Sequence, residues 1–193
     1  MKALRSVLVL FLPLSPCLLA QTAPAPTPFP PVRSQVIVGT QQRRIGESYQ
    51  KTMEIGPKVI VEGSARLTPI PEAEATMMIV TMDTRAKYTQ KVEVYHVLSR
   101  ETLPVPAANN GDRRTLTFTP SSVTFDSYRD STNIGGAVYK YYVYALRDSA
   151  TKNIVDFQTN YTQLAAAVKT DPSLREEILK LNKGANFPTT FKK

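Results

Sequence analysis

From residue 35 to about residue 160, short runs of apolar and β-branched residues alternate with clusters of turn-forming residues. Alternation with a period of about two places one set of side chains in a core and the other in solvent, as in a half-buried β-strand. We therefore expect extended segments at 35–45, 51–55, 57–67, 75–83, 89–99, 114–119, 122–126, 137–147 and 153–159. Short strands separated by turn residues predict a mainly β protein, an antiparallel β-sandwich or barrel.

The alternation in two segments also predicts which side chains point inward. Tyr95 and Val97 share one face of the segment 89–99. Leu116 and Phe118 should point into the core, with the intervening threonines outward. Residues 109–112 have the sequence Asn-Asn-Gly-Asp, and these residue types tolerate a positive φ, so we expect a tight turn before residue 114.

The segment 137–147 carries the most specific pattern. Tyr139, Tyr141, Val143 and Ala145 occupy alternate positions and should share one face. This order resembles the penultimate strand of fibronectin type III and other immunoglobulin-like sandwiches, where that face lies in the core and a hairpin leads to the last strand. The resemblance implies an immunoglobulin-like β-sandwich at 35–160, with Tyr139 or Tyr141 as a tyrosine corner whose hydroxyl bonds to nearby backbone.

The other face of the same segment is also apolar, with Tyr142, Tyr144 and Leu146. A contiguous apolar face of this kind is covered by the domain itself or by a partner. We expect the C-terminal extension 161–193 to cover it. If the extension does not dock, Tyr142 and Tyr144 become candidates for binding a protein, or for stacking sugar rings.

The extension predicts two short helices, at 162–169 and 172–181, separated at Asp171-Pro172. In the second helix, Leu174, Ile178 and Leu181 recur at helical spacing and form an apolar stripe. We expect this stripe to pack on the sandwich, and otherwise to bind a partner.

The N-terminal residues 1–20 have the pattern of a secretory signal peptide, with basic residues, a short apolar run and Ala20 before the cleavage point. The apolar run is too short to span a bilayer, so we expect no transmembrane span after cleavage. Pro16 precedes Cys17, where a lipid-anchored cysteine would follow a small residue, so we expect no lipid. The proline-rich residues 21–34 predict an extended linker.

Cleavage removes Lys2 and Arg5 and lowers the net charge from +8 to +6. The remaining basic residues are dispersed, without the run that tracks a nucleic-acid backbone, so we expect no nucleic-acid partner. An exported basic surface fits an envelope protein or assembly component as partner, with an anionic glycan as an alternative. We expect a monomer.

Few residue types for catalysis are present. His96 is the single histidine and Cys17 the single cysteine, which argues against a serine hydrolase, a zinc site and a cofactor, and we expect no enzyme. A glycoside hydrolase needs only two carboxylates and remains a distant alternative. Its candidate carboxylates are Glu62, Glu72, Glu74, Asp83, Glu93 and Glu101.

The layout of signal peptide, linker, strands and terminal helices resembles small secreted immunoglobulin-like proteins encoded beside type IV pilus-like genes in gut commensal bacteria. The resemblance implies an exported, non-enzymatic protein at the cell surface, in the periplasm or on the outer membrane. No functional residue carries over from it. The binding candidates from the sequence are therefore Tyr142, Tyr144, Leu174, Ile178 and Leu181, for a protein partner or, as the alternative, a carbohydrate.

Overall fold

The computed structural model describes residues 28–46, 49–64, 68–109, 111–126 and 135–191. The predicted signal peptide, residues 21–27 of the predicted linker and the last two residues lie outside these ranges. The described elements, in chain order, are β1 (Val32–Arg44), β2 (Gln50–Gly63), β3 (Ala73–Asp83), the π-helical turn η1 (Ala86–Gln90), β4 (Tyr95–Val105), β5 (Arg113–Thr117), β6 (Ser121–Asp126), β7 (Ala137–Asp148), β8 (Ile154–Thr159), α1 (Thr162–Thr170), α2 (Leu174–Leu179) and β9 (Asn186–Phe187).

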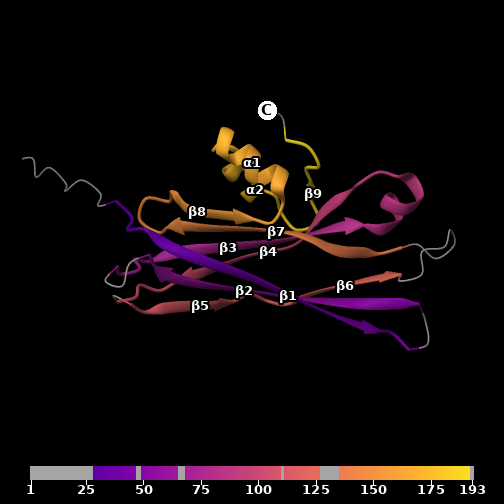
Figure 1. Ribbon diagram of the computed structural model, residues 1–193, viewed down its shortest axis with the longest axis horizontal. Coiled ribbons are helices and arrows are strands. Elements are labelled where there is room, and N and C mark those ends of the chain that lie inside the picture. The colour runs from indigo at the N-terminus through magenta and orange to yellow at the C-terminus, as the bar shows by residue number, and fades with distance from the viewer. Residues whose placement is uncertain (1–27, 47–48, 65–67, 110, 127–134, 192–193) are drawn as a thin grey trace, which may run out of the picture.

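The strands form two antiparallel sheets. In the first sheet, β2 pairs with β1 on one side and with both β5 and β6 on the other. The second sheet has the order β8-β7-β3-β4-β9. The sheets lie face to face, and α1 and α2 cover the outer face of the second sheet (Figure 1). This arrangement confirms the predicted mainly β, immunoglobulin-like antiparallel sandwich with short C-terminal helices.

β2 passes through a proline without interruption, although the sequence predicts separate strands at 51–55 and 57–67. The carbonyl of Pro57 accepts a hydrogen bond from the N–H of Phe118 at 3.1 Å, so the backbone of Pro57 faces the side of β5 and β6. β5 pairs with β2 from Lys58 onward and β6 pairs with it up to Ile55. The missing N–H of Pro57 therefore lies in the gap between two partner strands, where the ladder needs no donor.

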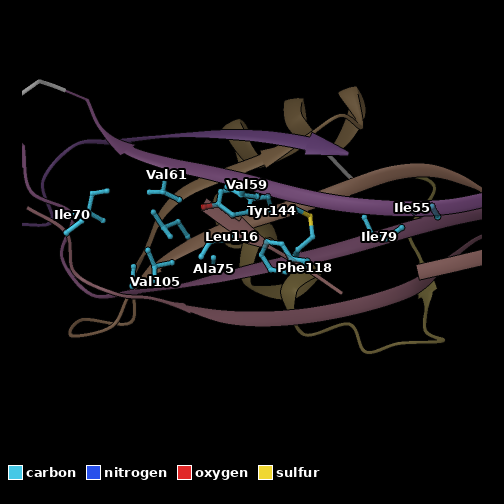
Figure 2. Close-up of a cluster of buried hydrophobic side chains, with 14 of the residues drawn as sticks. Ile55, Val59, Val61, Ile70, Ala75, Ile79, Val105, Leu116, Phe118 and Tyr144 are labelled. Atoms are coloured by element: carbon cyan, nitrogen blue, oxygen red, sulfur yellow. The ribbon is translucent and has the colours of Figure 1, made fainter. Parts of the chain in front are cut away.

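Two hydrophobic cores share the second sheet. The first core lies between the sheets and includes Ile55, Phe118, Ile79 and Tyr144, which are labelled in Figure 2. The second core lies between the second sheet and the helices. The second sheet is consequently buried on both faces, which explains why β3 and β7 are apolar at consecutive positions rather than at every other position.

The structure reverses the predicted orientation of β7. Tyr144 and Leu146 point into the core between the sheets, whereas Val143 and Ala145 point toward the helices. The pairing with β3 also shifts by one residue at Lys140, which places Tyr139 on the inner side of the sheet. Such a bulge moves the side chains beyond it to the opposite face, so the predicted common core face of 139–145 is wrong.

The helices dock on their own sandwich, as the sequence predicts. Leu164, Val168, Ile178 and Leu179 are buried against the second sheet. Two parallel hydrogen bonds of 2.9 and 2.8 Å join the guanidinium of Arg147 on β7 to the carboxylate of Glu176 on α2. None of the helices in the described residues is long and apolar enough to cross a membrane.

Two strand boundaries differ from the sequence prediction, and one strand was not predicted. β1 begins at Val32, inside the predicted linker. The expected strand at 89–99 begins only at Tyr95, because η1 and a left-handed Lys91 with φ of 60° precede it. The two-residue β9 pairs with the start of β4 and was not predicted.

Candidate functional site: the open edge of β1

β1 is an outermost strand, and within the described residues no strand pairs with its outer side. The carbonyl of Ser34 points to that side, because it accepts a hydrogen bond from Gln158 Nε2 at 2.9 Å. Backbone groups alternate between the two sides of a strand, so residues 36, 38, 40, 42 and 44 also direct their N–H and C=O outward. Consistently, the N–H of Ile45 turns back to Gln50 of β2 at 3.0 Å. The open edge from Val36 to Arg44 is about 30 Å long.

Natural proteins protect strand edges with proline, charged residues (lysine above all), bulges or short length. On β1 the charged residues lie near the two ends, and the middle of the edge has none of these features. β1 contains neither proline nor lysine and runs for 13 residues. Its pairing with β2 is regular throughout, whereas the pairings of β3 with β4 and β7, and of β7 with β8, contain register shifts. A long, regular, open strand is a template for a further strand.

The first core is incompletely covered along the same side. Val36 and Val38 point inward and pack against this core, yet both remain only partly buried. Tyr139 and Tyr142 of β7 are also partly buried against it. β1 begins beside β8 and runs away from β7 toward the β1–β2 hairpin (Figure 1). A strand added along β1 would complete the burial of the two valines.

Large apolar side chains are exposed mainly on the β1–β2 hairpin. Ile37 on the outer face of β1 is 42% exposed, and Ile45 and Tyr49 near the tip are 44% and 54% exposed. Among the described residues, Val92 is the other large apolar side chain in this exposed class. Three of the four exposed large apolar side chains of the described residues therefore belong to the β1–β2 hairpin.

The charge on β1 is entirely basic. Arg33, Arg43 and Arg44 lie on the strand, which contains no acidic residue. Arg43 forms an exposed ion pair with Glu54 on β2, with 3.6 Å between Nη2 and Oε2. The uncharged stretch between Ser34 and Gln42 separates basic ends, so the edge combines an apolar middle with basic flanks.

Tyr144 and Tyr142 do not form the exposed platform that a sugar would need. Tyr144 is 0% exposed, and its hydroxyl lies 3.2 Å from Ser34 Oγ in the first core. Burial raises the pKa of this hydroxyl. Tyr142 is partly exposed, and burial and then the charge of Asp156 raise its pKa. Only Tyr142 of this pair is accessible to a ligand.

The predicted apolar stripe of the second helix is used inside the domain. Ile178 is 3% exposed in the second core, and Leu174 and Leu181 are partly buried against it. These residues therefore do not form a free partner-binding face. An apolar hollow of about 400 Å³ does lie on the outer side of α1, between Ala166, Ala167 and Phe191 of the C-terminal segment.

The tyrosine-corner prediction is not matched by the contacts of the described residues. The hydroxyl of Tyr139 accepts a hydrogen bond from Asn160 Nδ2 at 3.4 Å, and burial raises its pKa to about 12. Tyr141 stacks on Tyr161, with ring centroids 4.1 Å apart. The tyrosine hydroxyl that donates to backbone here is that of Tyr161, which bonds the Thr189 carbonyl at 2.8 Å.

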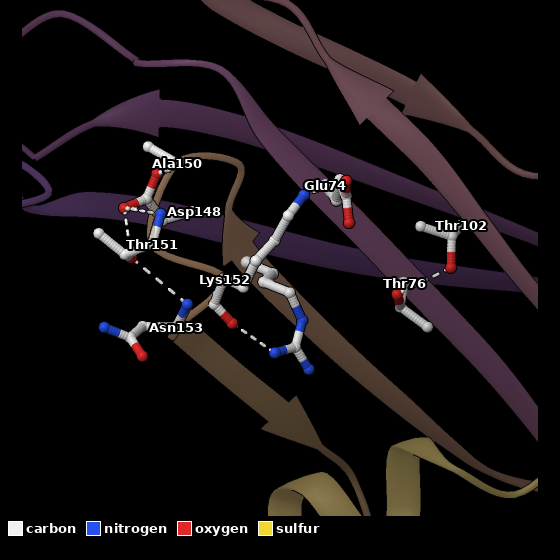
Figure 3. A network of polar contacts seen from close by, with 9 residues as sticks. Glu74, Thr76, Thr102, Asp148, Ala150, Thr151, Lys152 and Asn153 are labelled. Carbon is white, nitrogen blue, oxygen red and sulfur yellow. Dashed lines mark hydrogen bonds and ion pairs between the residues drawn. The ribbon is translucent and has the colours of Figure 1, made fainter.

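Three of the candidate carboxylates have structural contacts with neighbouring segments. Glu62 pairs with Arg113 at 2.8 Å, and Glu101 accepts hydrogen bonds from the N–H and hydroxyl of Thr119 at 2.6 and 3.0 Å. Glu74 pairs with Lys152 at 2.9 Å, in the polar network beside the β7–β8 turn that Figure 3 shows.

Asp83 accepts a hydrogen bond from the N–H of Ala86 at 2.8 Å. Glu93 and His96 have structural contacts as well. Glu93 contacts Lys87 and accepts a hydrogen bond from the Tyr95 hydroxyl at 2.6 Å, and these contacts lower its pKa. His96 lies in β4, with its carbonyl 3.4 Å from the Thr81 hydroxyl. Within the residues described, no group of three or more histidine, cysteine or acidic side chains is placed to hold a metal ion.

The sequence pattern did not predict that β1 has an open edge. Its signal was present, because residues 32–44 contain neither proline nor lysine. Which strand is outermost, however, depends on strand order, and strand order is fixed by contacts distant in the sequence.

No family model matches this sequence, and no curated protein matches it. A calcium-binding mutant of Bacteroides uniformis beta-glucuronidase 2 is similar in structure, with a TM-score of 0.35, 14% identity and coverage of 64% of this chain and 12% of its own. A protein from Akkermansia muciniphila has a TM-score of 0.32 and 13% identity, and the match covers 67% of this chain and 71% of that protein. A beta-glucosidase from Listeria innocua has a TM-score of 0.25 and 11% identity, over 66% of this chain and 16% of its own. Likeness this low carries no argument about function.

Proposed function

We propose that the mature chain is an exported, non-enzymatic binding protein of the bacterial envelope, and that it binds a partner protein by adding an extended segment of that partner to β1. In this role the protein is an accessory component of a surface assembly such as a pilus or a secretion machine. The signal peptide and linker predicted at 1–34 support export and a spaced attachment.

The open edge of β1 is the observation that carries this proposal. Its outward N–H and C=O groups supply main-chain hydrogen bonds to any extended segment, and main-chain bonds give strand addition much of its affinity. The partly buried Val36 and Val38 supply apolar contact. Ile37 adds an exposed contact on the other face of the added strand.

A carbohydrate-binding function has less support. Sugar-binding surfaces use exposed aromatic rings in a common plane. Tyr144 is buried in the first core and leaves Tyr142 without its predicted neighbour. We therefore place the glycan-binding function second, to be tested in the same experiment.

The test compares Thr40→Pro with Thr40→Ala in the mature protein. Thr40 is exposed and directs its N–H outward, so proline removes a donor from the open edge without breaking the ladder with β2. Alanine at the same position keeps the N–H and is the matched control. Both variants and the parent protein are used for affinity capture from the detergent-solubilised envelope of the source organism, with mass spectrometry and a parallel glycan array.

The proposal predicts that the parent and Thr40→Ala capture the same envelope protein and that Thr40→Pro loses it. Equal capture by all three proteins would contradict binding at β1. Saturable glycan binding that Tyr142→Ala abolishes, with no protein captured, would replace the proposal with the carbohydrate function. Circular dichroism of Thr40→Pro is the control that tests whether the fold is retained.

A further inference from the structure

A like-charge pair lies at the end of the open edge. Arg44 of β1 and Lys51 of β2 are directly opposite in the strand register. On its other side Lys51 lies opposite Phe125 of β6. Like charges directly opposite in an antiparallel pair destabilise the sheet. This position therefore costs stability that a neutral or acidic residue would not.

No acidic side chain compensates this pair within the described residues. Arg43, the neighbour of Arg44, has an ion pair with Glu54, and Arg113 has one with Glu62, but none joins Arg44 or Lys51 to a carboxylate. Asp126 and Lys51 line the same hollow of about 310 Å³ at this end of the sandwich, without an ion pair between them. Among the described residues, the two positive groups therefore have no carboxylate partner.

Arg44 lies where an added strand would meet it, and Lys51 lies one strand further into the sheet. Val36, Val38 and Arg44 are separated by even numbers of residues, so their side chains lie on the same, inner side of β1. Lys51 shares that side with Met53 and Ile55 of β2. A strand running along β1 would bring its own inward side chains past the valines and then beside Arg44.

We infer that the partner segment carries acidic side chains at the end that lies beside Arg44 and Lys51, next to an uncharged β-forming stretch that lies along Val36–Gln42. This inference rests on the proposed function of β1. Because antiparallel pairing is the more stable form, the acidic residues occupy the N-terminal part of the partner segment. The basic pair thus determines the direction and register of the added strand.

The test uses the mature protein and synthetic peptides of about nine residues, long enough to follow Val36–Arg44. The first peptide alternates threonine and valine and has glutamates at its N-terminal end. The second peptide has the glutamates at its C-terminal end, and the third has lysines in place of the N-terminal glutamates. Binding is measured by fluorescence anisotropy in low and high salt, on the parent, the double variant Arg44→Gln with Lys51→Gln, and Thr40→Pro.

We expect the N-terminal glutamate peptide to bind the parent most tightly. The double variant should weaken this peptide about fivefold and leave the lysine peptide unweakened, since each exposed charge pair contributes modestly. High salt should remove the preference between peptides. Lys51→Gln alone should leave the midpoint of thermal unfolding unchanged or higher, which separates a binding effect from loss of fold.

The outcomes separate the two proposals. Binding that Thr40→Pro abolishes, with no effect of the glutamate position or of the double variant, would overturn the acidic-segment inference and leave strand addition intact. Absence of binding by every peptide, or binding unaffected by Thr40→Pro, would contradict strand addition itself. Tighter binding of the C-terminal glutamate peptide would reverse the inferred direction of the strand.

Discussion

Gly136 joins the two sheets where the chain enters β7, and its replacement by alanine should destabilise the fold. Its φ is +86°, and it forms an isolated β-bridge with Phe125 of β6. Its carbonyl accepts hydrogen bonds of 3.0 Å from both the N–H and the hydroxyl of Thr84. A Cβ here would lie 2.0 Å from the carbonyl oxygen of Thr124 and 2.7 Å from Cα of Phe125. Both are backbone atoms, so a change of rotamer cannot relieve the clash.

Two costs add in Gly136→Ala. The left-handed backbone costs a non-glycine residue about 1 to 2 kcal/mol. Forcing a methyl group against fixed atoms costs about 1 to 3 kcal/mol more. Gly184 has a φ of +84° with nothing within 4 Å of the added Cβ, so Gly184→Ala should lose only the first cost. Gly135 has neither the positive φ nor a close neighbour, and Gly135→Ala should change stability by about 0.5 kcal/mol or less.

The assay is urea unfolding of the mature protein and the three variants, followed by circular dichroism. We expect losses in the free energy of unfolding of roughly 2 to 5 kcal/mol for Gly136→Ala and about 1 to 2 kcal/mol for Gly184→Ala. Equal losses in these two variants would refute the close approach of β6 to the start of β7.

Three further predictions concern the buried layers. Leu164→Ala should lower the free energy of unfolding by about 2 to 5 kcal/mol in urea titrations, because Leu164 is 0% exposed beneath α1. Tyr144→Phe should cost about 1 to 2 kcal/mol in the same assay, since it leaves the Ser34 hydroxyl without its buried partner. Hydrogen bonds from Arg147 lower the pKa of Glu176. The stabilising contribution of Glu176 is therefore complete above its unfolded pKa, near 4.3, and is lost as the pH falls through the lower folded pKa. In acid unfolding, Glu176→Gln should make the free energy of unfolding depend less on pH in this range.

The sequence predicts most elements of the fold but not their orientation. The alternation of β7 separates Tyr142, Tyr144 and Leu146 from Val143 and Ala145 correctly. Both sets are apolar because the second sheet is covered on both faces, so the alternation cannot say which set faces which layer. The bulge at Lys140 leaves no sequence signal either.

The break predicted at 56 in β2 is wrong for a related reason. The sequence predicts a strand break just before Pro57, yet β2 continues and the missing N–H of Pro57 falls between β5 and β6. That gap depends on residues about sixty positions away, which the local pattern around Pro57 does not contain. The open edge of β1 was not predicted either, because an open edge is a property of the whole sheet.

Because two cores share the second sheet, one face of this sheet stays uncovered until synthesis of the chain is nearly complete. Residues up to Thr159 complete both sheets except β9, and α1 and α2 follow them in the sequence. Until the last thirty or so residues have been synthesised, the side chains of Met78, Val80 and Val143 are not buried by the helices. A nascent or truncated chain ending near residue 160 would thus expose an apolar sheet face. We expect chaperones to bind this face during synthesis, and we expect the protein to aggregate if proteolysis removes its C-terminus.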